Sequence, residues 1–287
     1  MIVMKRVLVI LLILSGWNCS NDDSTNLPEV QTGMFVDERD SVQYRYVTVG
    51  NQMWMAENLR HKLVGGAFDG CWTWNEVLPV LDVDGLVELA ESYVMDGKIS
   101  WDLMDEVYKL AGEDLTYKEI IDQLGDKLSN EFLTDFYKTN PNEKFLTDYG
   151  YLYDYEAALK AVPEGWRLPT DEDWQLLEQN LGMSAHESAI LNEWRGDRQG
   201  ELLKQTGEGL DFGALLCGGK VYGSGNYTNV YTDKDLNAYF WSATAYADSD
   251  STKVAIVRGI GKYQTGILRF TSRLENTAFS VRCVKDK

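Results

Sequence analysis

The stretch that decides the fold is Gly165-Trp166-Arg167-Leu168-Pro169-Thr170-Asp171-Glu172-Asp173-Trp174. Pro169 disfavours a helical backbone in the residue before it, so the chain arrives extended. Thr170 is a good N-cap for a helix, and Asp173, three residues later, stands where a capping box needs an acidic side chain. We therefore predict an extended approach, a turn and a helix start here, with Trp166 and Trp174 anchored in the core.

The composition describes an acidic protein with a substantial core. The chain has 287 residues, 44% of them hydrophobic, and a formal net charge of −18. This length suffices for one large domain or two small ones. The charge argues against nucleic acid and anionic lipid surfaces as partners. With only His61 and His186 present, a histidine-rich metal site is excluded, and we expect no metal and no cofactor.

The first residues have the features of a secretory signal. Lys5 and Arg6 precede an apolar run over residues 7–14, which is short for a membrane span. We therefore predict a signal peptide over residues 1–18 that takes no part in the fold.

Cys19 resembles the lipid-attachment cysteine of bacterial lipoproteins, although residues 16–18 depart from the usual pattern before it. The acidic stretch 20–23 is similar to the one that directs Bacteroidetes-type lipoproteins to the outer surface. We predict a lipidated, solvated tether over 19–41, with the lipid anchor as the only membrane contact. The alternative is an ordinary signal peptide cleaved nearby, with Cys19 incidental.

The segment after the tether predicts two strands joined by a tight turn. Residues 44–49 follow an alternating pattern, Gly50 and Asn51 supply the turn, and residues 53–55 supply the second strand.

Residues 76–144 predict an acidic helical insertion. Apolar residues recur at helical spacing in four segments, near 86–94, 101–111, 116–124 and 128–137. The block holds 17 acidic and 6 basic residues, a net charge of −11. We expect a small core of its own and an acidic outer face. Two aspartate–glycine segments, 82–85 and 96–99, suggest calcium loops, but helix capping explains both more simply because neither aligns its first ligand position with a carboxylate.

The remainder predicts an α+β fold. After the helical block we expect a strand-like segment over 149–153 and helices over 155–161 and 171–181, the second with Gly182 as its C-cap. Loops rich in glycine follow, and short strands close the chain near residues 239–242, 253–259, 268–270 and 278–284.

Five sequence blocks carry a closer resemblance: residues 49–59, 149–159, 163–170, 239–244 and 279–284. In content and order they resemble the Fibrobacter succinogenes major paralogous domain family (FISUMP). Members are typically secreted or lipid-anchored bacterial proteins, and their molecular function is mostly unassigned. The resemblance implies a C-type-lectin-like domain over 42–287, with two helices, short antiparallel strands and long loops, interrupted by the helical block. It also implies a surface-exposed lipoprotein of the outer membrane.

The family motifs contain the residues to which we assign structural roles: Trp166, Arg167, Pro169, Thr170, Trp174, Trp241, Arg282 and Cys283. A buried arginine is ordinarily paired with a carboxylate, so we predict ion pairs for Arg167 and Arg282, with Asp171 or Asp173 as natural partners.

The cysteines depart from the family pattern. Val162 occupies a position at which members usually carry a cysteine, so the resemblance implies that Cys283 has lost its usual partner. Cys71, Cys217 and Cys283 remain, and the sequence leaves the three single pairings among them open.

We predict a non-catalytic binding or adhesion module whose ligand is a surface glycan or protein. Its candidate ligand contacts are the aromatic side chains among the glycines, Tyr222, Tyr227 and Tyr231, which can stack on sugar rings or simply pack the loops. The Glu-Pro-Asn, Gln-Pro-Asp and Trp-Asn-Asp motifs of calcium-dependent lectins do not occur in the sequence.

Two alternatives stay open. One is an enzyme related to the formylglycine-generating sulfatase-modifying group, which uses paired reactive cysteines. The only basic residue near Cys217 that can lower its thiol pKa is Lys220, and no catalytic residue stands out. The other is a structural or protein-interaction role of the helical block.

Overall fold

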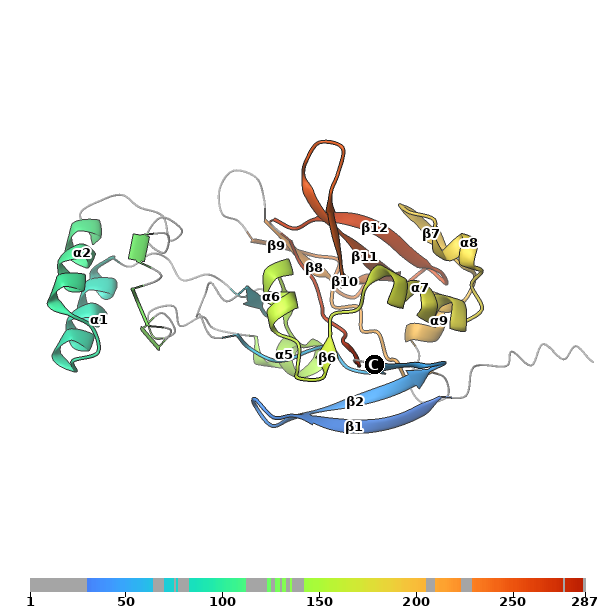
Figure 1. Ribbon diagram of the computed structural model, residues 1–287, viewed down its shortest axis with the longest axis horizontal. Coiled ribbons are helices and arrows are strands. Elements are labelled where there is room, and N and C mark those ends of the chain that lie inside the picture. Colours follow the sequence, from blue (N-terminus) through green and yellow to red (C-terminus); the bar gives the residue numbers. More distant parts are fainter. Residues whose placement is uncertain are drawn as a thin grey trace, which may run out of the picture.

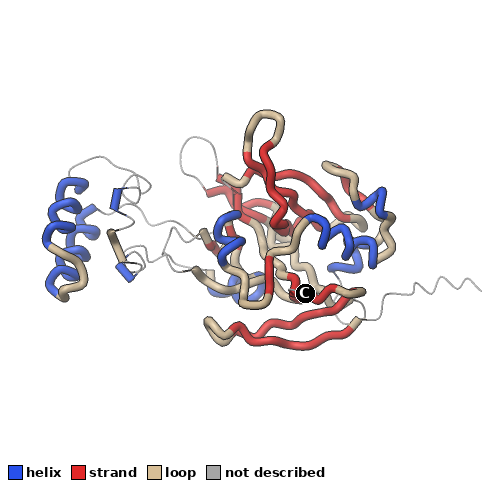
Figure 2. Tube along the Cα trace, in the orientation of Figure 1, coloured by secondary structure: helices blue, strands red, loops and turns tan. Residues whose placement is uncertain are grey.

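The computed structural model describes residues 30–63, 70–74, 76, 83–111, 123–124, 127–129, 131–132, 135, 142–204, 210–222, 229–275 and 277–285. It combines helices with antiparallel sheets, which confirms the predicted α+β class (Figures 1 and 2). In these ranges no helix has the length and apolar character needed to cross a membrane. The predicted signal peptide, Cys19 and Tyr227 lie outside the described residues.

A five-stranded sheet contains both ends of the described chain, in the order β1 (Gln31–Asp37), β2 (Val42–Val49), β3 (Gln52–Met55), β14 (Val284–Lys285) and β6 (Trp166–Arg167). The predicted hairpin is confirmed: Val49 pairs with Gln52 across the turn, where Gly50 has a φ of 58°. The extended approach to the deciding stretch is β6, which hydrogen-bonds to the C-terminal strand. The motif therefore joins the first and last segments of the fold.

The predicted tether extends too far into the chain, because its last part is β1. This strand pairs with β2 along its whole length, from Gln31 opposite Thr48 to Asp37 opposite Val42. Phe35 stacks on Trp166 at 4.3 Å, which supplies an apolar contact 131 positions away in sequence. Gly33 leaves room for the Tyr46 ring, which a Cβ there would meet at 2.4 Å. The pairing with β2 and the contact with Trp166 together outweigh the polar, unpatterned local sequence.

A four-stranded sheet follows the order β10 (Asn237–Ala247), β11 (Lys253–Gly261), β12 (Ile267–Arg273) and β7 (Glu193–Arg195). The predicted strands near 239, 253 and 268 form its long members, whereas the short strand β7 carries no alternating pattern and was not predicted. Two smaller sheets complete the described set: β13 (Thr277–Ala278), β8 (Gly219–Tyr222) and β9 (Asn229–Thr232) in one, and β4 (Cys71–Trp72) with β5 (Leu152–Tyr153) in the other.

The predicted strand over 278–284 is two short strands instead. β13 pairs in the three-stranded sheet and β14 in the five-stranded sheet, and the segment between them bridges Phe279 to Tyr153 and Ser280 to Phe240. This segment crosses from one sheet to the other, so one continuous ladder is not possible.

The helices of the sheet-bearing part are α5 (Glu143–Tyr149), α6 (Tyr155–Lys160), α7 (Asp171–Asn180), α8 (Ala185–Ser188) and α9 (Gln199–Lys204). The expected helices at 155 and 171 are confirmed. The predicted strand-like segment over 149–153 is confirmed only at its end, by β5, and is corrected at its start by α5, which runs to Tyr149 with Asn142 as its N-cap. Gly150 follows with a φ of 77°, which turns the chain into the two-residue strand β5.

Helices α1 (Val83–Met95) and α2 (Trp101–Ala111) lie beside each other at one end of the molecule (Figure 1). They match the first two helices predicted in the acidic block. Of the third only residues 123–124 are described, as helix, and the fourth is also described only in part. Gly97, with a φ of 70°, ends α1, and Lys98 donates its backbone N–H to Tyr93 O. The aspartate–glycine pair at 96–97 is thus a helix end.

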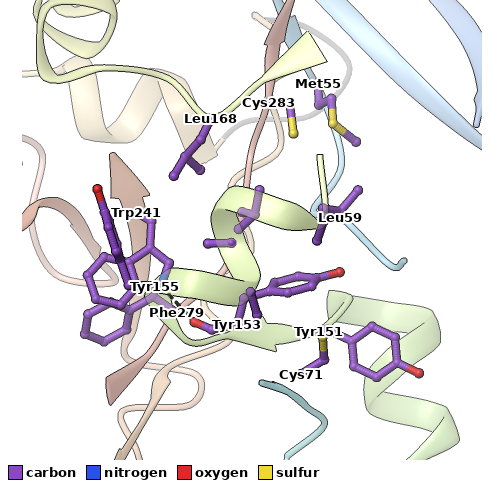
Figure 3. Packing of buried hydrophobic residues seen from close by; sticks show 14 of the residues in the cluster. Met55, Leu59, Cys71, Tyr151, Tyr153, Tyr155, Leu168, Trp241, Phe279 and Cys283 are labelled. Atoms are coloured by element: carbon purple, nitrogen blue, oxygen red, sulfur yellow. Dashed lines mark hydrogen bonds between the residues drawn. The ribbon is translucent and has the colours of Figure 1, made fainter. Parts of the chain in front are cut away.

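Three buried clusters account for most of the described core. One contains Trp54, Trp174 and Phe212, with Trp54 and Trp174 at 4.7 Å. A second contains Trp166 and Trp241, and Figure 3 shows part of it around α6, with Cys71 and Cys283 on separate sides. The third draws its buried members only from residues 86–132. The deciding stretch therefore places one tryptophan in each of the first two clusters.

Candidate functional site

The deciding stretch forms a capped helix start and a charged network rather than an open site. The capping box is present as predicted: Asp173 N donates to Thr170 Oγ1 at 3.2 Å, and Thr170 N donates to Asp173 Oδ2 at 2.8 Å. Arg167 pairs with Asp173, with Nη2 3.0 Å from Oδ1. The predicted ion pair of Arg167 is therefore confirmed, and its partner belongs to the cap itself.

Asp171 and Glu178, both on α7, hold arginines from the four-stranded sheet. Arg269 Nη2 lies 2.6 Å from Asp171 Oδ2, and Arg258 Nε lies 2.6 Å from Glu178 Oε1. Arg195 Nη1 donates to Glu178 Oε2 at 2.9 Å. Burial alone raises the pKa of Asp171, but the hydrogen bond from Arg269 and the charge of Arg258 outweigh it and lower the pKa to about 2. This network fastens α7 to β7, β11 and β12.

Arg282 differs from the prediction, because it has no carboxylate partner in the described part of the chain. It is fully buried and donates to Asn58 Oδ1 at 2.6 Å and to the backbone oxygens of Met55, Phe212 and Gly213 at 3.3, 2.5 and 2.8 Å. Burial lowers the pKa of Arg282 to about 9. Carbonyl dipoles replace the expected ion pair because the end of β3 and the loop at 212–213 both turn backbone oxygens toward this one guanidinium.

Asn58 joins three of the family blocks beneath the protein surface. Its Oδ1 accepts from Arg282, and its Nδ2 donates to Tyr149 O at 2.8 Å and to Ser280 Oγ at 3.3 Å. Gly150 packs against the same segment, since a Cβ there would lie 2.5 Å from Leu59 O. The blocks at 49–59, 149–159 and 279–284 thus meet at one buried amide.

A polar hollow of about 190 Å³ lies directly above this junction, and we call it the Asn58 hollow. Arg45 reaches Asp211 Oδ2 at 3.1 Å, and Arg60 Nη1 lies 3.2 Å from Glu57 Oε1. These side chains are only partly covered, so their outer hydrogen-bonding positions face solvent. The hollow is lined by Arg45, Ala56, Glu57, Asn58, Arg60, Thr147, Asp148, Tyr149, Gly150, Gly213 and Leu215.

A second hollow of about 200 Å³ is also lined by Tyr149, and we call it the Lys234 hollow. Lys234 Nζ lies 5.2 Å from the centre of the Tyr149 ring, a cation–π contact. The hydrogen bond from Lys234 to Asp235 raises the pKa of Lys234, which keeps it cationic. The lining consists of Asn142, Lys144, Phe145, Asp148, Tyr149 and Lys234. Tyr149 and Asp148 therefore belong to both hollows.

Of the three tyrosines predicted to contact a ligand, the structure describes the side chain of Tyr231 alone. Tyr231 is half-buried, its hydroxyl donates to Glu76 O at 3.0 Å, and its ring lies 5.3 Å from Trp74. Trp74 contacts Phe145 at 6.1 Å, and Phe145 contacts Tyr149 at 4.9 Å. Tyr231 is thus the inner end of a series of rings whose outer end is Tyr149. The side chain of Tyr222 and all of Tyr227 lie outside the described residues.

Glu57, Asn58 and Tyr149 lie within the sequence motifs, but the sequence does not predict a site at them. The polar residues inside otherwise aromatic and aliphatic blocks indicate a role other than packing. They do not indicate which residues meet in space, because Asn58 and Tyr149 are 91 positions apart in sequence.

The cysteines are buried, and Cys217 and Cys283 are free thiols, so the pairings that involve either of them do not form. Cys217 Sγ lies 3.0 Å from Ser280 Oγ, and burial raises the thiol pKa of Cys217 despite that contact. Burial also raises the pKa of Cys283. A raised pKa and a closed environment both oppose nucleophilic chemistry, which requires a reachable thiolate.

One group of three potential metal ligands occurs among the described residues: Asp37, Asp40 and His61. Both oxygens of Asp37 accept from Arg39, at 2.9 and 2.6 Å, and His61 Nδ1 lies 2.7 Å from Asp40 Oδ2. A guanidinium already occupies the charge position that a cation would take, so this group fits an ion-paired turn better than a metal site.

The described residues define an α+β protein of antiparallel sheets that carries two adjoining polar hollows around one tyrosine. Over residues 47–285 the chain matches the Fibrobacter succinogenes major domain, and it belongs to that family. Searches among curated proteins and among solved structures found no match.

Proposed function

We propose that this chain is a non-catalytic glycan-binding module that holds its ligand in the two hollows around Tyr149. The supporting observation is that three family blocks converge on Asn58, directly beneath the Asn58 hollow, and leave polar side chains facing outward. Glu57 and Arg60 also hold local structure, because Glu57 Oε2 accepts from Arg45 N at 2.7 Å and Arg60 Nη2 donates to Gln43 O at 2.9 Å. The side chains of Arg45, Glu57 and Arg60 nevertheless stay partly exposed at the hollow, where they can meet a polyhydroxylated ligand.

The chemistry of the hollows suits sugar hydroxyls, which both donate and accept hydrogen bonds. Glu57 and Asp148 offer carboxylate acceptors, and Arg45 and Arg60 offer donors. Tyr149 offers a ring against which a sugar face can stack. Each hollow is smaller than the roughly 300–1,000 Å³ of a pocket for a drug-sized molecule. Each therefore suits one sugar ring of a longer chain.

The wider setting of the proposal comes from the sequence. A C-type-lectin-like domain that includes β1 as its first strand, interrupted by the acidic block 76–144, would be tethered through Cys19 to the outer membrane and would present the hollows at the cell surface. The free, buried thiols of Cys217 and Cys283 favour a binding role over the formylglycine-type enzyme.

The test is a glycan array probed with the whole mature chain, with and without calcium. We expect binding in both conditions, because the calcium-dependent lectin motifs are missing from the sequence. Tyr149→Leu removes the ring but keeps apolar packing, and Glu57→Gln removes a charge but keeps the shape. Each should weaken binding more than about tenfold.

Tyr263→Ala is the matched control, because Tyr263 is 80% exposed and does not line either hollow. It should bind like the unmodified chain. A silent array, or equal binding by Tyr149→Leu and the control, would refute the proposal.

A further inference from the structure

The α1–α2 pair exposes large apolar side chains that its own core does not use. Met95 is 79% exposed, Trp101 64% and Tyr108 45%. The inner side of the pair is already filled, because the third buried cluster contains Leu86, Ala90, Met104 and Val107. Exposed tryptophan and methionine on a helix surface are unfavourable in water, and grouped exposure of this kind marks an interaction surface.

These side chains lie on one continuous face. On α2, Trp101, Asp105 and Tyr108 follow each other at intervals of four and three, so they share a side of the helix. On α1, Glu91 and Met95 are four apart and share a side. The Tyr108 hydroxyl donates to Glu91 Oε1 at 2.5 Å, which joins the two sides.

Glu88 lies one turn before Glu91 on the same side of α1 and is exposed. We call these six residues the acidic aromatic face: Glu88, Glu91, Met95, Trp101, Asp105 and Tyr108. Glu88 and Asp105 have no ion pair within the described part of the chain. Lys98, in the loop between the helices, pairs with Glu131 at 2.8 Å and lies over the Tyr93 ring. Lys109, four residues after Asp105 on α2, is exposed beside the face and adds one positive charge. With three carboxylates against one lysine, the face keeps a net negative charge beside its apolar groups.

We propose that the acidic aromatic face docks a cationic protein segment that carries large apolar side chains. Three carboxylates would attract Lys or Arg of the partner, and Met95, Trp101 and Tyr108 would cover its apolar side. The site is separate from the Tyr149 hollows, and the proposal does not rest on glycan binding.

The probe is a fluorescently labelled synthetic amphipathic helix of leucine and lysine, titrated with the whole mature chain and followed by anisotropy. Its leucine–glutamate counterpart should not bind. Trp101→Ala should weaken binding of the lysine peptide more than about tenfold. Tyr149→Leu should leave it unchanged, which separates this site from the hollows.

The charge test compares two triple variants that remove the same number of carboxylates. E88Q/E91Q/D105N should weaken binding about tenfold at low salt and flatten its salt dependence. E172Q/E193Q/D250N changes exposed acidic residues far from α1 and α2 and should stay within about twofold of the unmodified chain. Equal weakening by the two triple variants, an unchanged Trp101→Ala, or no binding of the lysine peptide would overturn the proposal.

Discussion

Around Glu178 the arginines are sealed from water, whereas around Glu57 they keep a side that faces solvent. Arg258 and Glu178 side chains are 0% exposed, but those of Arg45 and Glu57 are 42% and 25% exposed. The same pair of chemical groups therefore fastens α7 to the four-stranded sheet in one region and forms a polar rim in the other. Burial, not residue type, separates a structural ion pair from a group that can bind a ligand.

We call the ion pairs around Glu178 the sealed region and those around Glu57 the open region. Breaking the sealed region should have the largest effect on the free energy of unfolding. Glu178→Gln leaves Arg195 and Arg258 buried with too little negative charge, at a cost of about 3–5 kcal/mol in the free energy of unfolding. Urea denaturation measures this cost. Glu57→Gln is the counterpart in the open region and should cost less than about 1 kcal/mol. Equal costs would remove the distinction between the two regions.

Acid should weaken the sealed region next. The folded-state pKa of Asp171 is about 2 against an ordinary 3.8, so its ionised form stabilises the fold above pH 4. That contribution, on the order of 2 kcal/mol, is lost as the pH falls from about 4 toward 2. Unfolding free energies at a series of pH values should show the fall, and Asp171→Asn should reduce its slope. An unchanged slope in that variant would contradict the assignment.

The helix cap at Thr170 should contribute less to the free energy of unfolding than the ion pairs of Glu178 and Asp171. Thr170→Ala removes the acceptor for the Asp173 backbone N–H and should cost about 1 kcal/mol. Thr170→Ser keeps the acceptor and should restore most of the loss. Thermal unfolding of the three chains measures the difference, and an alanine variant as stable as the serine variant would show that the cap is not needed.

The open region should show the smallest effect on stability and the largest on binding. Arg45→Gln removes a half-exposed pair with Asp211 and should change the free energy of unfolding by less than about 1 kcal/mol. Its affinity for an array-selected glycan should nevertheless fall about tenfold, because a donor of the Asn58 hollow is lost. Parallel denaturation and calorimetric titration separate the two quantities.

Local sequence was sufficient where local chemistry decides the structure. The capping box at Thr170, the hairpin turn at Gly50 and the helix end at Gly97 each depend on neighbours within a few positions, and each was predicted. β7 was missed because its pairing partner, β12, lies far along the chain. β1 pairs with the neighbouring strand β2, but its apolar contact with Trp166 is distant in sequence and its own residues are mostly polar. α5 was missed because the aromatic texture around Tyr149 favours a strand, whereas the Asn142 cap starts a helix.

The candidate site, too, could be predicted from local sequence only in part. The residues that meet at Asn58 were recognised as motifs, but their meeting depends on a segment near the C-terminus, Ser280 to Arg282, passing beneath the turn at Gly150. We predicted a carboxylate partner for Arg282 because a buried arginine is ordinarily paired with one. Backbone oxygens of Met55 and of the loop at 212–213 serve instead, and no local sequence pattern predicts such an arrangement.

Calorimetric titration of Tyr149→Leu with an array-selected glycan tests the central claim most directly. Tyr149 is the one aromatic side chain common to both hollows and the outer end of the series that leads inward to Tyr231. We expect the affinity to fall more than about tenfold while the melting temperature stays close to that of the unmodified chain. An unchanged affinity in a normally folded variant would place the ligand elsewhere and contradict the account.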